Sequence, residues 1–158
     1  MTAPCDDETV SSGTVSDRDY QRLLVFRTGL RRFERWSEEQ AEAAGLTGGQ
    51  HQLLLAVRGH PDRRGPTIGD AADYLLLRHH SVVELVDRVE AAGLVRRTAD
   101  ADDRRVVRLR LTPRGAAVLR RLSRTHLDEL ARVAAGFDAL WAGLEPTKHL
   151  PPSQRTPP

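Results

Sequence analysis

The feature that most constrains the fold is a change in hydrophobic spacing near the middle of the chain. Up to Gly93 the apolar residues recur every three or four positions, which is the spacing of one face of an α-helix. Residues 94–98 and 106–111 instead form two short strand-like runs, and the second alternates Val107, Leu109 and Leu111 with arginines. Helical spacing resumes after Pro113. This order predicts a mostly α fold with one small β-hairpin.

Three capping-box pairs predict where the first three helices begin. In such a pair a Ser or Thr side chain accepts a hydrogen bond from the backbone three residues further on, and the side chain there bonds back. The chain has three of these pairs: Ser16 with Asp19, Thr47 with Gln50, and Thr67 with Asp70.

Two further helices are expected, one before and one after the hairpin. The fourth helix should run from about His79 to Ala92, with Gly93 in the position of a C-terminal glycine. The last helix begins with Thr112 as cap and Pro113 at its first position, and Gly136 is expected to divide it in two. The predicted buried stripe of the fourth helix is Val82, Leu85, Val86 and Val89.

Composition and motifs exclude several classes of protein. The chain has 158 residues, which fits one domain with an appended oligomerisation element, and it has no apolar run near the ~18 residues of a membrane span. The acidic start does not resemble a secretory signal, so a cytoplasmic location is expected. The single Cys5 excludes an intramolecular disulfide and a Cys-based zinc site. No phosphate loop or hydrolase motif occurs, so we expect no enzyme activity, cofactor or metal.

The expected order of elements gives a domain organisation. Residues 1–15 are polar and acidic and residues 146–158 hold five prolines, so both are predicted to be disordered tails. Between them, short helices followed by a hairpin over about 47–112 make a winged helix-turn-helix, which places one helix in the DNA major groove and the hairpin against the backbone or minor groove. The flanking helices, about 17–44 and 113–145, have apolar seams without a partner in a small domain, which indicates dimerisation.

Three stretches of the sequence resemble the MarR (multiple antibiotic resistance regulator) family of transcriptional regulators. They are Leu85–Arg97, Asp102–Val107 and Leu111–Gly115, in the order and spacing of that family's recognition helix, wing and dimer-helix entry. The resemblance covers roughly residues 18–145 and makes 16–145 a MarR-like domain. It implies a homodimer that represses transcription from an inverted-repeat operator and is released by a small, often aromatic, effector.

The candidate base-reading residues lie at the start of the fourth helix, because the first turn of a recognition helix reaches the base edges. His79 and His80 can bond to purine edges, Val83 can contact a thymine methyl group, and Glu84 can accept from cytosine or simply repel phosphate. The alternative for the histidine pair is a surface without a role. The full set expected on this helix is Arg78, His79, His80, Ser81, Val83, Glu84 and Arg88. Thr67 is expected either to contact a phosphate or only to cap its helix.

The predicted wing is rich in arginine. Residues 94–115 hold seven arginines against three aspartates, a local net charge of +4 in a chain whose net charge is +2. In the family pattern Arg105 contacts the groove and Asp103 braces it, with Arg104 beside them; an arginine gains from the negative potential of a narrow minor groove. The alternative is a solvated turn.

Two further sets of residues are expected to serve association and effector binding. Arg27, Trp36 and His51 are candidates to line an effector pocket between the dimer helices and the winged body, with plain packing as the alternative. A second function class also stays open: a winged-helix protein-interaction or small-molecule-binding module without specific DNA binding. The expected dimerisation residues are Leu23, Phe26, Leu30, Leu130, Val133, Phe137, Leu140 and Trp141.

Overall fold

The computed structural model describes the backbone of residues 15–141 and the side chains of residues 15–134. Both predicted tails, apart from residue 15, lie outside this range, as does Cys5. The elements follow the predicted order of four helices, a hairpin and a long helix. Their bounds are α1 (Asp17–Ala43), α2 (Gly48–Gly59), α3 (Ile68–Leu75), α4 (His79–Ala91), β1 (Val95–Ala99), β2 (Val107–Leu111) and α5 (Pro113–Trp141).

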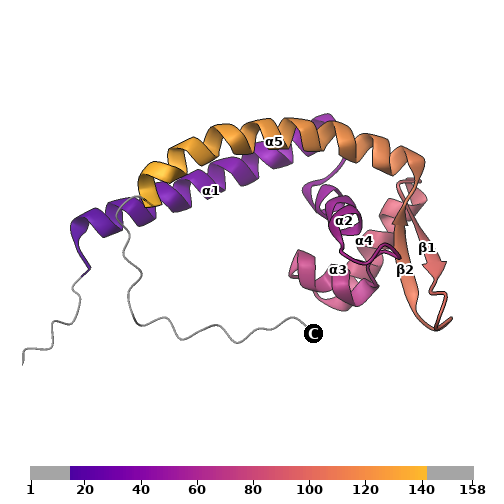
Figure 1. Cartoon of the computed structure of the whole chain (residues 1–158). Helices are drawn as coiled ribbons and strands as arrows, with labels where there is room; N and C mark the ends of the chain where they lie inside the picture. The colour runs from indigo at the N-terminus through magenta and orange to yellow at the C-terminus, as the bar shows by residue number, and fades with distance from the viewer. Residues whose placement is uncertain (1–14, 142–158) are drawn as a thin grey trace, which may run out of the picture.

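The elements form a long helix pair with a winged body below one end of it (Figure 1). Helices α1 and α5 run side by side in opposite directions, while α2, α3, α4 and the hairpin gather beneath the first half of α5. The mostly α winged-helix fold with one hairpin is therefore confirmed.

The helices begin where their sequences predict. Ser16, Thr47 and Thr67 each form a complete capping box with the residue three positions on. At the other end of α4, Gly93 has a φ of +70°, a left-handed conformation that glycine adopts without steric cost. These local signals set the bounds of the helices before any long-range packing is considered.

The core joins the winged body to α5. The predicted stripe of α4 is buried against α2 and the hairpin, and the first half of α5 closes the same core from above. Burial of apolar side chains on this scale supplies most of the folding free energy of a small domain. The side chains that are fully buried or nearly so include Leu53, Leu54, Val82, Val86, Val89, Leu109, Leu119 and Leu122.

The hairpin is extended by a backbone contact from the loop before α3. β1 and β2 pair antiparallel with Val95 opposite Leu111. The Leu109 N–H donates to the Pro66 carbonyl at 2.8 Å, so the loop lies along the outer edge of β2. Gly65 permits this approach, because a Cβ there would lie 2.1 Å from the Leu109 carbonyl oxygen. The root of the wing is therefore fixed to the body of the domain.

The prediction that Gly136 divides the last helix is wrong. α5 continues without a break from Pro113 to Trp141. A glycine inside a helix costs about 1 kcal/mol relative to alanine but removes no backbone hydrogen bond, so a well-packed helix passes through it. In the described residues, no helix is both long and apolar enough to cross a membrane.

Candidate nucleic-acid interface

Helix α4 presents its predicted base-reading residues on its outer face. Burial of the apolar stripe fixes the rotation of the helix, because a residue 100° away from a buried one must face another direction. Of the predicted base-reading residues, Ser81 and Val83 are half-buried. The exposed ones are Arg78, His79, His80, Glu84 and Arg88.

The start of α4 has an unusual cap. Arg78 occupies the N-cap position and its side chain accepts no hydrogen bond from the first turn. Leu76, two residues before Arg78, has a φ of +53°, which strains a residue with a Cβ. First-turn N–H groups without a side-chain acceptor can bind water or an anion such as a phosphate.

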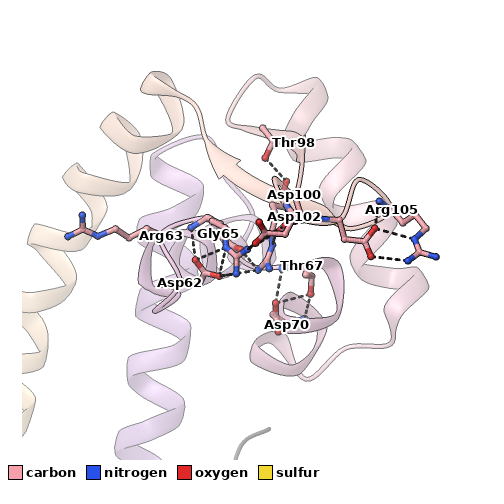
Figure 2. Close-up of polar contacts among 12 residues, drawn as sticks. Asp62, Arg63, Gly65, Thr67, Asp70, Thr98, Asp100, Asp102 and Arg105 are labelled. Carbon is pink, nitrogen blue, oxygen red and sulfur yellow. Dashed lines mark hydrogen bonds and ion pairs between the residues drawn. The ribbon is translucent and has the colours of Figure 1, made fainter.

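The wing tip presents a braced arginine. The Arg105 Nε and Nη2 donate to the two carboxylate oxygens of Asp103 at 3.1 and 3.3 Å, and its backbone N–H donates to Oδ1 at 3.0 Å. These bonds hold the pKa of Asp103 below its ordinary value. The Arg105 side chain is 91% exposed and points away from the body of the domain (Figure 2). The expected brace between Asp103 and an arginine is therefore present, and Arg104 beside it is also exposed.

An ion network at the base of the wing was missed by the sequence reasoning. The Asp100 side chain is 4% exposed and accepts from Arg108 Nε at 2.7 Å and from the Asp102 backbone at 2.9 Å. These hydrogen bonds, the backbone bond first, lower the pKa of Asp100 to about 2. Arg64 joins from the loop before α3 and bonds to Asp62 and Asp102 as well.

The network ties the wing to the loop between α2 and α3 (Figure 2). Arg108 Nη1 donates to the Gly65 carbonyl at 3.0 Å, and Arg110 Nη1 donates to the Arg63 carbonyl at 2.7 Å. The alternating pattern of β2 predicts only that Arg108 lies on the opposite face of the strand from Leu109. The sequence does not indicate which acid pairs with Arg108, because that depends on where the loop between α2 and α3 packs.

Carboxylates neutralise some of the arginines of the hairpin, so its positive charge is smaller than the number of arginines suggests. Arg97 Nη2 bonds to Asp87 at 2.6 Å, and Arg97 also pairs with Glu90, both on α4. Arg108 is paired with Asp100 as described. The exposed arginines Arg96, Arg104, Arg105 and Arg110 are therefore the groups of the hairpin that a phosphate can reach, and of these Arg105 is paired with Asp103.

Thr67 is engaged in its capping box. Its hydroxyl donates to Asp70 Oδ2 at 2.8 Å and accepts from the Asp70 backbone at 3.1 Å. The Asp70 carboxylate thus occupies the positive end of α3, where it would oppose a phosphate. The geometry fits the capping alternative, and phosphate contact by Thr67 stays a prediction.

The expected dimerisation residues on α1 and α5 include exposed apolar side chains. Leu23 is 55% exposed, Leu30 is 41% exposed and Leu130 is 45% exposed. All three lie on the two long helices. Phe26 and Val133 are half-buried. Phe137, Leu140 and Trp141 lie in the last turns of α5, outside the residues whose side chains are described.

Two of the three effector-pocket candidates meet at a packed junction. His51 from α2 is 3% exposed and packs at a tilt against His126 of α5, with ring centroids 4.6 Å apart, and Trp36 of α1 packs on the same imidazole at 4.9 Å. Arg27 lies exposed farther along α1. The junction is filled by these rings, which fits the packing alternative.

The junction also holds a defined hydrogen-bond chain. His126 Nδ1 lies 2.8 Å from the Leu122 carbonyl, which can only accept, so Nδ1 carries the proton. His126 Nε2 forms a hydrogen bond with Ser37 Oγ at 2.8 Å. Burial, and next the neighbouring His126, lower the pKa of His51, so His51 is neutral at physiological pH.

Other kinds of site find little support in the described part of the chain. No three His, Cys, Asp or Glu side chains there gather closely enough to hold a metal ion. One open hollow lies between α2 and α3, lined by Gln52, Leu55, Ala56, Gly59, Tyr74 and Leu75. The sequence reasoning did not predict it.

The fold and the exposed face of α4 define the class as a winged helix-turn-helix protein of the kind found in transcription regulators. Residues 44–106, which span α2 to the wing, match the model of the MarR family. This match covers less than half of the chain, and together with the fold of its structural neighbours it makes the chain similar to the MarR family.

The structural neighbours cover most of the chain. A MarR family transcription regulator is 26% identical with a TM-score of 0.67, over 80% of this chain and 82% of that one. AbsC, a MarR family transcriptional regulator from Streptomyces coelicolor, is 20% identical with a TM-score of 0.66, over 84% and 93%. A MepR variant from Staphylococcus aureus, bound to an oligodeoxyribonucleotide, is 22% identical with a TM-score of 0.58, over 78% and 83%. No curated protein matches the chain.

Proposed function

We propose that this protein is a non-enzymatic, cytoplasmic repressor that binds double-stranded operator DNA as a homodimer. The observation that carries the proposal is the pairing of two exposed features: the first turn of α4, with Arg78, His79 and His80, and the braced Arg105 at the wing tip. A helix for the major groove and an arginine for the minor groove are the two parts a winged helix uses. The MepR relative bound to an oligodeoxyribonucleotide supports the same use of this fold.

The homodimer is supported by the exposed seams of α1 and α5. Side chains such as Leu23 and Leu130 are exposed on two packed helices, and apolar surface of this kind is stabilised by burial against a second copy. Two copies related by a two-fold axis would present their α4 helices about 34 Å apart, one turn of an inverted-repeat operator.

A small aromatic effector would act at the junction of α1, α2 and α5, where Trp36 and His51 meet. The junction joins the winged body to the helix pair, so a ligand that forces these rings apart would change the spacing of the two α4 helices. Such a ligand shifts the equilibrium only if it binds the DNA-incompetent arrangement more tightly.

The test is binding of a labelled duplex from the region upstream of the gene, measured across a salt series. We expect salt-dependent affinity in the wild-type protein and a loss of at least tenfold for Arg105→Ala, with an unchanged melting temperature because Arg105 is exposed. The control is Arg58→Ala, which removes an exposed arginine from α2. Wild-type protein that shows no salt-dependent binding would favour the alternative, a winged-helix interaction module without specific DNA binding.

A further inference from the structure

The outer face of the first half of α5 carries four exposed arginines and no acid. The sequence has no Asp or Glu between Asp103 and Asp128. With 100° per residue, the four arginines fall within an arc of about 120° on the side of α5 opposite to the buried Leu119 and Leu122. Within that arc the other exposed residues of this half of the helix are Pro113 and the small Ala117, and the exposed Asp128 follows on the same face one turn after Arg124. The α5 arginine stripe is Arg114, Arg120, Arg121 and Arg124.

The stripe arginines have no carboxylate partner among the described residues, as is also the case for Arg31 and Arg32 on α1, but unlike those two they lie on a stretch of helix without acids. On α5 Arg132 pairs with Glu129, and on α1 Arg35 pairs with Glu39. Among the described residues, the stripe arginines form no ion pair, and Arg114 donates only to the Ala92 carbonyl, at 3.2 Å. Within residues 15–134, whose side chains are described, the charge of the stripe is therefore offset only by the Ala92 carbonyl at the end of α4 and by Asp128 one turn after Arg124.

The electrostatics of the stripe oppose helix formation. Arg124 lies three and four positions after Arg121 and Arg120, and like charges at these separations repel on a helix. Arg114 lies in the first turn, where the helix dipole is positive and disfavours a cation. An anionic partner would relieve both effects.

The stripe is separate from the surface proposed to hold the operator. α5 starts at the root of the hairpin, whereas Arg105 lies at the opposite end, at the tip (Figures 1 and 2). The stripe also precedes the exposed apolar residues Leu127 and Leu130. A two-fold contact between copies through the stripe would bring arginine against arginine, which makes it a poor dimer surface.

We propose that the α5 arginine stripe binds the phosphate backbone of a second segment of double-stranded DNA. The inference rests on the proposed function, because α4 and the wing are taken to hold the first segment. Arg114 and Arg124 are ten residues apart, or about 15 Å of helix, and three of the four cations lie within the last ~6 Å. One DNA strand carries a phosphate every ~3.4 Å, so these three cations span the length of about two successive phosphates. Guanidinium groups also match phosphate oxygens as bidentate donors.

The experiment saturates the full-length protein with a short, unlabelled duplex from the upstream region and then titrates a fluorescein-labelled duplex of unrelated sequence. Binding of the second duplex is followed by anisotropy at several salt concentrations. The test variant is Arg120→Gln/Arg121→Gln/Arg124→Gln. The control, Arg31→Gln/Arg32→Gln/Arg58→Gln, removes the same charge from exposed positions on α1 and α2.

We expect the wild-type and control complexes to bind the second duplex and the stripe variant to lose at least tenfold in affinity. The slope of log affinity against log salt should fall by about 0.9 per arginine that contacts a phosphate, or roughly 2.7 for three. The stripe variant should keep its affinity for the short first duplex and its sedimentation as a dimer.

Three results would overturn the inference. They are a saturated wild-type complex that binds no second duplex, a stripe variant that binds it like the control, and a stripe variant that loses the first duplex or the dimer to the same extent. Failure of the proposed function gives a different result, because wild-type and control proteins would then bind neither duplex.

Discussion

Gly115 is the position where the packing of the wing against α5 is least tolerant of change. A Cβ at this residue would lie 2.0 Å from the carbonyl oxygen of Leu94 and 2.9 Å from its carbonyl carbon. Both contacts are with backbone, so no side-chain rotation relieves them. Leu94 and α5 would have to separate by more than about 1 Å to restore ordinary van der Waals contact.

That separation would break the bonds that join β1 to α5. The Leu94 carbonyl accepts from the Thr112 backbone at 3.0 Å and from its hydroxyl at 3.2 Å. Overpacking costs about 1–3 kcal/mol, and each weakened hydrogen bond about 1 kcal/mol. Alanine returns about 1 kcal/mol of helix propensity. Gly115→Ala should therefore lower the free energy of unfolding by about 2–4 kcal/mol.

The measurement is urea denaturation followed by circular dichroism, with Gly69→Ala as the matched control. Gly69 also lies in the first turn of a helix, but a Cβ there meets only Thr67 Oγ1 at 3.6 Å, an ordinary contact. Gly69→Ala should be neutral or stabilising by up to about 1 kcal/mol. A Gly115→Ala protein as stable as Gly69→Ala would refute the argument that the Leu94 carbonyl is held rigidly against α5.

Three further predictions concern the junction, the wing and the helix seams. Because the pKa of His51 is lowered on folding, its contribution to stability is present above the unfolded value of about 6.5 and is lost as pH falls toward the folded pKa; His51→Gln should flatten the fall in melting temperature below that pH. Asp100→Asn removes the charge that holds Arg108, so amide exchange in residues 100–106 should accelerate while α1 is unaffected; equal exchange rates would exclude a structural role for the network. Leu130→Glu should shift sedimentation from dimer to monomer without unfolding the winged body, whereas an intact dimer would place the seam elsewhere.

The order of elements and the helix starts were predictable because their signals are local. Each capping box joins residues three positions apart, and the stripe of α4 repeats within a single helix. Gly136 shows the limit of the same reasoning, since a local cost of about 1 kcal/mol does not end a helix whose backbone continues through it.

The DNA-facing candidates were selected by the same local logic together with the family resemblance. The sequence placed Arg105 two residues after Asp103, and a short polar turn lets such neighbours bond. The roles of these residues toward DNA stay predictions. Charge counting was less informative, because it treated Arg97 and Arg108 as free cations although carboxylates from α4 and from the end of β1 neutralise them.

By itself the sequence determined the helices, the hairpin, the buried face of α4 and the family resemblance, because periodicity and capping depend on residues a few positions apart. Only the tertiary structure decided how the wing is anchored and what surrounds the buried histidines. Arg64 meets Asp100 across 36 positions, and Ser37 meets His126 across 89. Contacts of this kind form only after the core has brought distant segments together, so no local pattern specifies them.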